Sequence, residues 1–346
     1  SMNIQYSRGC PYNCEFCDIV VLNGNRPRTK VEKQILAELE SLYQYGWRGS
    51  VFVVDDNFIG KKQKLKEGIL PAIIDWMQKR RYPFTLLTET SINLADDEEL
   101  IRLMVDAGFD TVFIGLESPN EESLAECNKS QNKKRDLIAA VKKIQNYGLQ
   151  VQGGFIVGFD SDPPSIFKNQ ISFIQNSGIV TAMVGLLNAP RGTRLYKRLQ
   201  KEQRLLDGFS GDNMDCSINF IPRMKYETLI NGYKYILKTI YAPKQYYERI
   251  RMCLMEYRPK KKKGALLKLR TYHLTAFMKS IWILGIWGKG KKYYWKLMLS
   301  TLFQHPHLLP LAVSLSVYGF HFRKIVEKCA RLPITNALET GKGSRI

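Results

Sequence analysis

The chain has 346 residues, of which 45% are hydrophobic and 24% are charged. These values are typical of a globular protein, and they exclude a disordered, collagen-like or disulfide-stapled chain. No apolar run reaches the roughly 18 residues that a membrane-spanning helix needs. The length fits either one large α/β domain with an appendage or two ordinary domains.

The net charge of +20 is unevenly distributed along the chain. Residues 1–222 contain 27 Lys and Arg against 27 Asp and Glu, whereas residues 223–346 contain 25 against 5. The second part also holds all four histidines and three of the five tryptophans. We therefore predict a domain boundary here, with domains at 1–222 and 223–346, and an acidic partner for the second domain only.

Short β-rich runs alternate with helical stretches in the first part of the chain. The predicted strands cover residues 4–6, 50–54, 84–88, 111–115, 151–157 and 182–186. A glycine that can adopt a positive φ follows the intervening helical stretch at Gly46, Gly108, Gly148 and Gly178. Six βα units with largely apolar strands predict a parallel sheet covered by helices, wound as a doubly wound fold or as a barrel. After residue 188 the alternation stops, and residues 223–346 are predicted to be mainly helical.

Three of the seven cysteines lie close together, at Cys10, Cys14 and Cys17. They fall on the predicted loop after the first strand. A four-iron cube takes one ligand per iron, so three cysteines leave one iron with an open position, as a catalytic site requires. A zinc site with a histidine as fourth ligand is less favoured because no histidine precedes His273, and three unbound cysteines are less favoured because they cluster on one loop. Clustered rather than evenly spread cysteines also indicate a reducing compartment, the cytoplasm.

The spacing C-x3-C-x-F-C, formed by Cys10, Cys14, Phe16 and Cys17, resembles the signature of the radical S-adenosylmethionine (SAM) superfamily. The resemblance implies a partial (βα)6 TIM-like barrel with its site at the C-terminal ends of the strands. It also implies a [4Fe-4S] cluster and SAM as cofactors, and an electron donor such as flavodoxin or ferredoxin. In that superfamily, reductive cleavage of SAM gives a 5′-deoxyadenosyl radical that abstracts hydrogen from an unactivated carbon.

The same resemblance assigns SAM contacts to the residues that end the predicted strands. Asp55 and Asp56 follow the second strand, where a carboxylate would bind the methionine amine; the alternative is a helix N-cap. Glu117 ends the fourth strand and would contact the ribose or the amine, with a surface carboxylate as the alternative.

Further SAM contacts follow from the remaining strand ends. Phe16 would pack on the adenine, and the segment GGFIVG at 153–158, which includes Ile156 and Gly158, would bind the adenine through its backbone. Asn188 would reach the adenine or ribose. Either Arg135 or Lys129 would pair with the methionine carboxylate. Glu89 is expected at the same end of the barrel, without an assigned role.

Other segments narrow the resemblance, among them QYSRG at 5–9, DDNFIG at 55–60 and GLLNAP at 185–190. They resemble the cobalamin-dependent radical SAM methyltransferases of the hopanoid C-2 methylase group. This implies the catalytic part of a C-methyltransferase that acts on a hydrophobic, lipid-like substrate. The cobalamin-binding domain that precedes the cluster motif in that group is absent from this sequence, as is an Asp-x-His-x-x-Gly motif. Two alternatives follow: a piece of a longer protein, or hydrogen abstraction without cobalamin.

The basic C-terminal part has three possible interpretations. It forms a solvated helical cap over the barrel, it binds an anionic lipid surface through lysines beside interfacial aromatic residues, or, less expected, it binds RNA. The lipid interpretation adds peripheral contact with the inner membrane face to a cytoplasmic location. An RNA-modifying enzyme and a non-catalytic, membrane-associated module that retains the cluster are the alternative functions.

Overall fold

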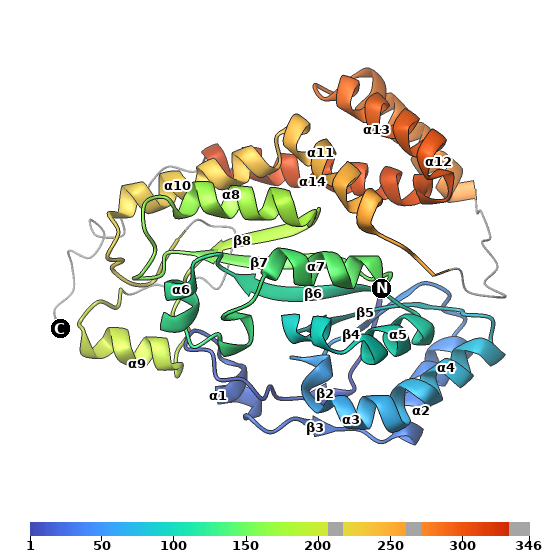
Figure 1. Cartoon of the computed structure of the whole chain (residues 1–346), viewed down its shortest axis with the longest axis horizontal. Helices are drawn as coiled ribbons and strands as arrows, with labels where there is room; N and C mark the ends of the chain where they lie inside the picture. Colours follow the sequence, from blue (N-terminus) through green and yellow to red (C-terminus); the bar gives the residue numbers. More distant parts are fainter. Residues whose placement is uncertain (207–216, 261–270, 332–346) are drawn as a thin grey trace.

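A computed structural model describes residues 1–206, 217–260 and 271–331. Its centre is a six-stranded parallel sheet with the order β1-β4-β5-β6-β7-β8 (Figure 1). The strands are β1 (Met2–Ile4), β4 (Ser50–Val53), β5 (Thr85–Thr90), β6 (Phe109–Glu117), β7 (Gln150–Val157) and β8 (Ala182–Leu186). Each strand joins the sheet beside its predecessor without the reversal of order that defines a doubly wound fold. The predicted partial (βα)6 barrel is confirmed.

The predicted strands all form, and the largest difference is at the start of the chain. We expected a strand at 4–6, but β1 ends at Ile4. The backbone N–H groups of Tyr6 and Ser7 each donate to the Asp55 carboxylate at 2.8 Å, so they are not available to a neighbouring strand. Ser7 instead opens the short antiparallel ribbon of β2 (Ser7–Arg8) and β3 (Arg28–Thr29), which brackets the cysteine segment.

Helices cover the sheet as the sequence predicts. The main ones are α2 (Glu32–Gln44), α4 (Leu70–Lys79), α5 (Glu98–Ala107), α7 (Leu137–Asn146) and α8 (Ile166–Ser177). Shorter elements are α1 (Ile19–Asn23), η1 (Phe58–Lys61), α3 (Lys62–Lys64), η2 (Leu65–Ile69), η3 (Ile92–Asp96), α6 (Glu121–Glu126) and η4 (Ser130–Asn132). The four glycines predicted to end helices all have positive φ, between 70° and 105°. Asp97 caps α5 by accepting a hydrogen bond from the Leu100 N–H at 3.1 Å.

The described C-terminal residues form helices, as predicted. They are α9 (Arg194–Lys201), α10 (Tyr226–Ile240), α11 (Pro243–Glu256), α12 (Thr271–Ser280), η5 (Ile281–Ile286), α13 (Lys291–Gln304), η6 (Pro306–Leu308) and α14 (Leu309–Arg331). Helix α10 packs on α8 and on β8, and Tyr241 donates its hydroxyl to the Ala182 carbonyl of this edge strand at 2.7 Å. Figure 1 shows α10, α11 and α14 stacked beyond α8, whereas α12 and α13 project from the body. The domain boundary at 222/223 stays a prediction.

Hydrophobic side chains of the barrel and of the C-terminal helices form one continuous core, which includes Ile114, Tyr246 and Tyr294. The C-terminal helices are therefore packed against the barrel rather than tethered to it. Among the residues that the structure describes, no helix is long and apolar enough to cross a membrane.

Candidate active site

A cavity of about 180 Å³ lies at the C-terminal ends of the parallel strands. The three clustered cysteines form one side of it. Acidic residues that follow or end successive strands, Asp56, Glu89 and Glu117, form the other side, together with Lys129. Because parallel strands place their C-terminal ends at one edge, residues far apart in sequence meet here.

The segment that carries the cysteines is held at its backbone on both sides. The Cys10 N–H donates to the Gly24 carbonyl at 3.3 Å. Glu15, which lies between Cys14 and Phe16, donates its N–H to the Cys127 carbonyl at 2.8 Å and accepts at its own carbonyl from the Leu195 N–H at 2.9 Å. These bonds tie the cysteine segment to α6 and α9, so its shape depends on tertiary contacts.

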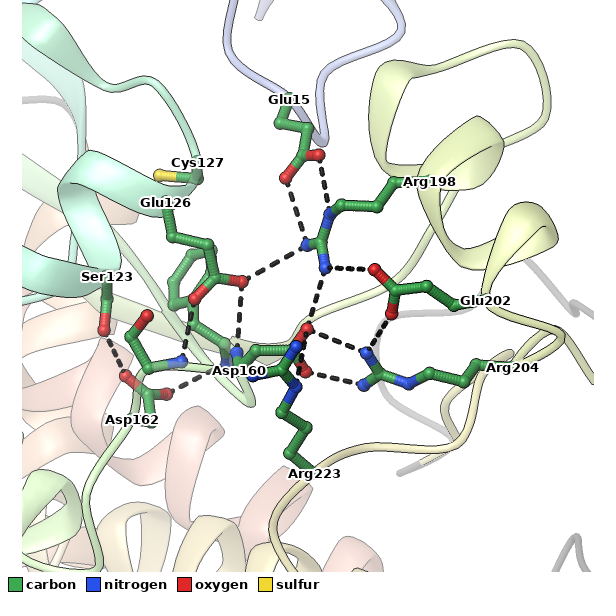
Figure 2. Close-up of polar contacts among 12 residues, drawn as sticks. Glu15, Ser123, Glu126, Cys127, Asp160, Asp162, Arg198, Glu202, Arg204 and Arg223 are labelled. Carbon is green, nitrogen blue, oxygen red and sulfur yellow. Dashed lines mark hydrogen bonds and ion pairs between the residues drawn. The ribbon is translucent and has the colours of Figure 1, made fainter.

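An ion-pair network fixes the Glu15 side chain as well (Figure 2). The Arg198 guanidinium makes a two-point contact with the Glu15 carboxylate, at 2.8 and 3.2 Å, and a further bond with Asp160 at 2.8 Å. Arg204 pairs with both carboxylate oxygens of Asp160, at 2.6 and 2.8 Å. Burial alone would raise the pKa of Asp160, but hydrogen bonds from the two arginines outweigh burial and lower it. The network therefore keeps Asp160 charged and joins the cysteine segment to the loop after β7.

The three thiols of the cysteine segment lie in a largely buried environment with amide donors nearby. Burial raises the pKa of all three thiols, that of Cys17 to about 11. The Asn57 and Gln131 side-chain amides donate to Cys10 Sγ and Cys14 Sγ, at 4.0 and 3.9 Å. Among the described residues, no three His, Cys, Asp or Glu side chains converge closely enough to hold one metal ion. In a four-iron cube each thiolate binds a different iron, so the ligands surround the cluster instead of converging. Three thiols on one segment supply the cysteine ligands that the predicted four-iron cube would take.

A buried ion pair lies beside the cysteines. Lys129 Nζ is 2.6 Å from Glu117 Oε1, and the side chains are only 11% and 8% exposed. Burial alone would lower the pKa of Lys129, but the charges of Glu117 and Cys14 outweigh burial and raise it. Glu117 has a φ of 62°, which an L-residue adopts only where its surroundings hold it there. Gly115 makes room for the pair, because a Cβ there would lie 2.4 Å from Glu117 Oε1 and 2.9 Å from Lys129 Nζ.

A second, larger cavity of about 560 Å³ lies next to the first. The two share the lining residues Phe16, Phe113, Gly115 and Glu117. Beyond these, the larger cavity runs along β7 and β8, and its far wall comes from the C-terminal helices. That wall is formed by Tyr233, Leu237 and Tyr241 at α10 and by Phe322, Ile325 and Val326 of α14. The two adjacent cavities thus give the site a polar part beside the cysteines and an apolar part beneath α10 and α14.

Comparison with known proteins agrees with this geometry. Residues 4–173 match the sequence model of the Radical SAM superfamily. This part of the chain belongs to the radical SAM superfamily. Residues 193–333 match a domain family of unknown function, DUF4070.

Two curated relatives resemble most of the chain. An uncharacterized methyltransferase, sll1242, from Synechocystis sp. is 39% identical over 95% of the chain, and the hopanoid C-2 methylase of Rhodopseudomonas palustris is 33% identical over 87%. The chain spans only 62% and 57% of their own lengths. Among solved structures, a radical SAM methyltransferase, TsrM, from Kitasatospora setae with cobalamin and a [4Fe-4S] cluster bound superposes with a TM-score of 0.60. It is 15% identical, covering 95% of this chain and 62% of TsrM, and shows that the fold is shared.

Most of the residues that we predicted to bind the cluster or SAM line these two cavities. Cys10, Cys14, Cys17 and Asp56 line the polar part, Phe16 and Glu117 line both parts, and Ile156 and Asn188 line the apolar part. Asp56 also accepts hydrogen bonds from the Gly9 N–H at 2.6 Å and from Asn23 Nδ2 at 3.1 Å. The SAM contacts of these residues stay predictions. Glu89 faces the same cavity, and burial together with the charge of Asp56 raises its pKa.

Three other predicted contacts are engaged elsewhere, and the residues that line the two cavities do not include them. The Asp55 carboxylate accepts from Tyr6 and Ser7 and is buried away from both cavities, which raises its pKa to about 6; it is not a helix N-cap either. Arg135 forms a two-point ion pair with Asp96 at 2.5 and 2.7 Å. Gly158 turns the chain after β7 with a φ of 109°, and its N–H donates to Asp162 at 2.8 Å. Each has a structural partner that the sequence pattern did not reveal.

Sequence reasoning did not find Glu15, Arg198 and Asp160, nor the amides of Asn57 and Gln131 near the sulfurs. Asn57 had a detectable signal, because it directly follows the predicted Asp55-Asp56 pair. Glu15 lies inside the cysteine motif, but at a position where the motif accepts any residue. Arg198, Asp160 and Gln131 lie on separate segments, so only the tertiary structure brings them to the cysteine segment.

Proposed function

We propose that this chain is the catalytic part of a radical SAM C-methyltransferase that acts on a hydrophobic, lipid-like substrate. The observation that carries this proposal is that the cysteine-lined cavity lies directly beside the apolar cavity beneath α10 and α14, with four lining residues in common. The names of the relatives support it, since they include a hopanoid C-2 methylase and a bacteriochlorophyllide d C-8(2)-methyltransferase from Chlorobaculum tepidum.

Cys10, Cys14 and Cys17 would hold the [4Fe-4S] cluster, and SAM would occupy the polar cavity beside them. When bound, these groups supply the 5′-deoxyadenosyl radical that removes hydrogen from an unactivated carbon. The adjacent charges of Glu117 and Lys129 match the zwitterionic methionine part of SAM, with the carboxylate facing the lysine and the ammonium facing the glutamate. This assigns the carboxylate contact to Lys129 rather than to Arg135, which is paired with Asp96.

The other cavity residues position the reactants and exclude water. Phe16 lies where the polar and apolar parts meet, so its ring would separate SAM from bulk solvent and orient the adenine. The apolar wall of Leu237, Phe322 and Ile325 would bind the substrate skeleton and keep water away from a reactive radical. The described residues thus supply a dry, shaped space next to a cluster site.

Cobalamin does not enter this assignment of residues. The sequence contains neither an Asp-x-His-x-x-Gly motif nor any histidine before His273.

The test is anaerobic turnover of the reconstituted chain with SAM and dithionite. We expect 5′-deoxyadenosine, and we expect none from the Cys14→Ala variant. A chain that holds about four irons but yields no 5′-deoxyadenosine would contradict the catalytic proposal and favour a non-catalytic module.

The hydrophobic substrate is tested separately with the fluorescent apolar probe N-phenyl-1-naphthylamine. We expect binding that Ile325→Asp weakens by roughly tenfold or more, because a carboxylate in an apolar wall is costly. Val317→Asp, at an exposed position of the same helix, is the matched control and should leave binding unchanged. Equal binding by both variants would remove the apolar cavity as the substrate site.

A further inference from the structure

The helical pair α12–η5 and α13 exposes apolar side chains that a globular protein normally buries. On α12 and η5 they recur about every four residues, which places them on one face of the helix. These residues are Leu274, Met278, Trp282 and Ile286, followed by Trp287, and Trp282 and Trp287 are 60% and 74% exposed. The opposite side is buried through Ser280 and Leu284. The exposure is therefore a property of one face rather than of a loose segment.

Helix α13 repeats the pattern. Its exposed apolar residues are Trp295, Leu299, Leu302 and Phe303, at the spacing of one helix face, and Phe303 is 81% exposed. Tyr294, Leu297 and Met298 are buried on the other side. Exposed apolar side chains that gather on a helix face of a soluble protein mark an interaction site. We call the exposed apolar residues of 274–303 and the lysines among them the aromatic–lysine surface.

The charge of this surface has one sign. Its exposed cations are Lys279, Lys289, Lys291, Lys292 and Lys296. From residue 257 to residue 326 the sequence contains no Asp or Glu. An anionic partner would thus meet positive charges without opposing carboxylates.

The aromatic–lysine surface is held on a preformed scaffold. Ser280 Oγ and Tyr294 Oη are 3.0 Å apart, and Trp295 Nε1 donates to the Gly285 carbonyl at 3.0 Å, which joins the two halves of the pair. The Tyr294 ring packs edge-on against Tyr247 of α11, at 6.4 Å between centroids. Figure 1 shows α12 and α13 projecting away from the sheet, where a flat partner can reach them.

We propose that the aromatic–lysine surface docks the protein onto an anionic lipid bilayer, with α12 and α13 lying in the plane of the headgroups. Tryptophan beside lysine is the composition that favours this boundary, because the rings enter the acyl region while the ammonium groups bind lipid phosphates. The charge complementarity selects an anionic bilayer over a second copy of this basic chain. The aromatic–lysine surface does not include the lysine run 260–263. Lys260 pairs with Asp106, and residues 261–263 lie outside the described residues.

The docking proposal does not depend on the proposed function. Docking would nevertheless bring the bilayer close to a helix that lines the apolar cavity. Helix α14 packs against both α12 and α13 and also supplies Phe322 and Ile325 to the wall of the apolar cavity. A bilayer held at α12 and α13 would therefore be connected to that wall through one helix.

The test is flotation of the full chain with two kinds of vesicle, phosphatidylcholine alone and phosphatidylcholine mixed with phosphatidylglycerol. We expect strong flotation only with the mixture, and weaker flotation at high salt, because screening shortens the reach of the lysines to about 10 Å or less. Replacing Lys289, Lys291 and Lys292 with glutamine should lower the partition coefficient by roughly fivefold per lysine. Trp282→Ala combined with Trp287→Ala should lower the partition coefficient by roughly tenfold or more in the same assay, because two large apolar side chains no longer enter the bilayer.

The matched controls are Lys168→Gln, Lys197→Gln and Lys201→Gln together, and Tyr45→Ala, which change exposed residues outside the surface. They should float like the unchanged chain. Equal flotation on both vesicles, or no effect of either set of surface variants, would overturn the proposal. A third result would assign the surface to a second copy of the chain instead. In that case the chain would not float, and it would form a concentration-dependent dimer that Trp282→Ala and Trp287→Ala abolish.

Discussion

Arg198 Nε lies 2.8 Å from Glu15 Oε1, which joins a helix beyond the last strand of the barrel to the centre of the cysteine segment. The two residues are separated by most of the barrel sequence, and the 9% exposure of Glu15 makes their contact hard for water to replace. The family region of unknown function that starts at residue 193 thus begins by holding the predicted cluster site in place.

The Arg198–Glu15 contact predicts that Arg198→Ala impairs cluster retention. The substitution leaves the Glu15 and Asp160 carboxylates without this partner, which should cost about 1–3 kcal/mol of unfolding free energy. Iron per chain after reconstitution and gel filtration, together with urea unfolding, measures the effect. Arg191→Ala, at an exposed position nearby, is the control. Full iron retention by Arg198→Ala would show that the backbone bonds of Glu15 suffice.

The cysteine assignment predicts a selective loss of iron. Alanine at Cys10, Cys14 or Cys17 should abolish the iron content of anaerobically reconstituted protein, because each thiolate holds a separate iron. Alanine at Cys127 or Cys253, both buried and unpaired, should leave about four irons per chain. Loss of iron in either control variant would move a ligand away from the predicted set.

Gly115→Ala tests the Glu117–Lys129 pair without removing either charge. The new Cβ would meet the ends of both side chains, which are flexible, so the pair should shift while the fold persists. We expect SAM affinity to fall by roughly tenfold, which corresponds to about 1.4 kcal/mol, with unchanged thermal stability and iron content. Gly185→Ala, where the added Cβ meets no atom within 4 Å, is the matched control. Unchanged affinity in Gly115→Ala would place SAM away from this pair.

Asp162 predicts a pH dependence of folding stability. Burial raises its pKa from 3.8 to about 6, against the effect of hydrogen bonds from Ser123, Gly158 and Phe159. The folded state then binds a proton that the unfolded state releases, so this contribution to stability is complete below pH 3.8 and is lost as the pH rises through 6. Asp162→Asn does not titrate.

The unfolding free energy of the unchanged chain, minus that of Asp162→Asn, should therefore fall by up to roughly 3 kcal/mol between about pH 4 and about pH 7. Urea unfolding of both proteins across this range measures the difference. A difference that rises with pH would mean that the three hydrogen bonds outweigh burial and lower the pKa of Asp162 instead.

The sequence by itself determined the features that depend on local pattern. Alternating βα segments, the glycines that end helices and the spacing of Cys10, Cys14 and Cys17 follow from neighbouring residues, because backbone preference and side-chain periodicity act over a few positions. These features were enough for the parallel fold and the superfamily. The strand order then decided between a barrel and a doubly wound sheet, a choice that local pattern leaves open.

Only the tertiary structure decided which charged residues face the site. Asp55 and Asp56 are adjacent in sequence, yet Asp55 is used by the backbone of Tyr6 and Ser7 while Asp56 lines the cavity. Arg135 and Lys129 were equivalent candidates until their partners, Asp96 and Glu117, were known. The physical reason is that a buried charge is placed by the partner that compensates its desolvation, and that partner lies on another segment of the chain.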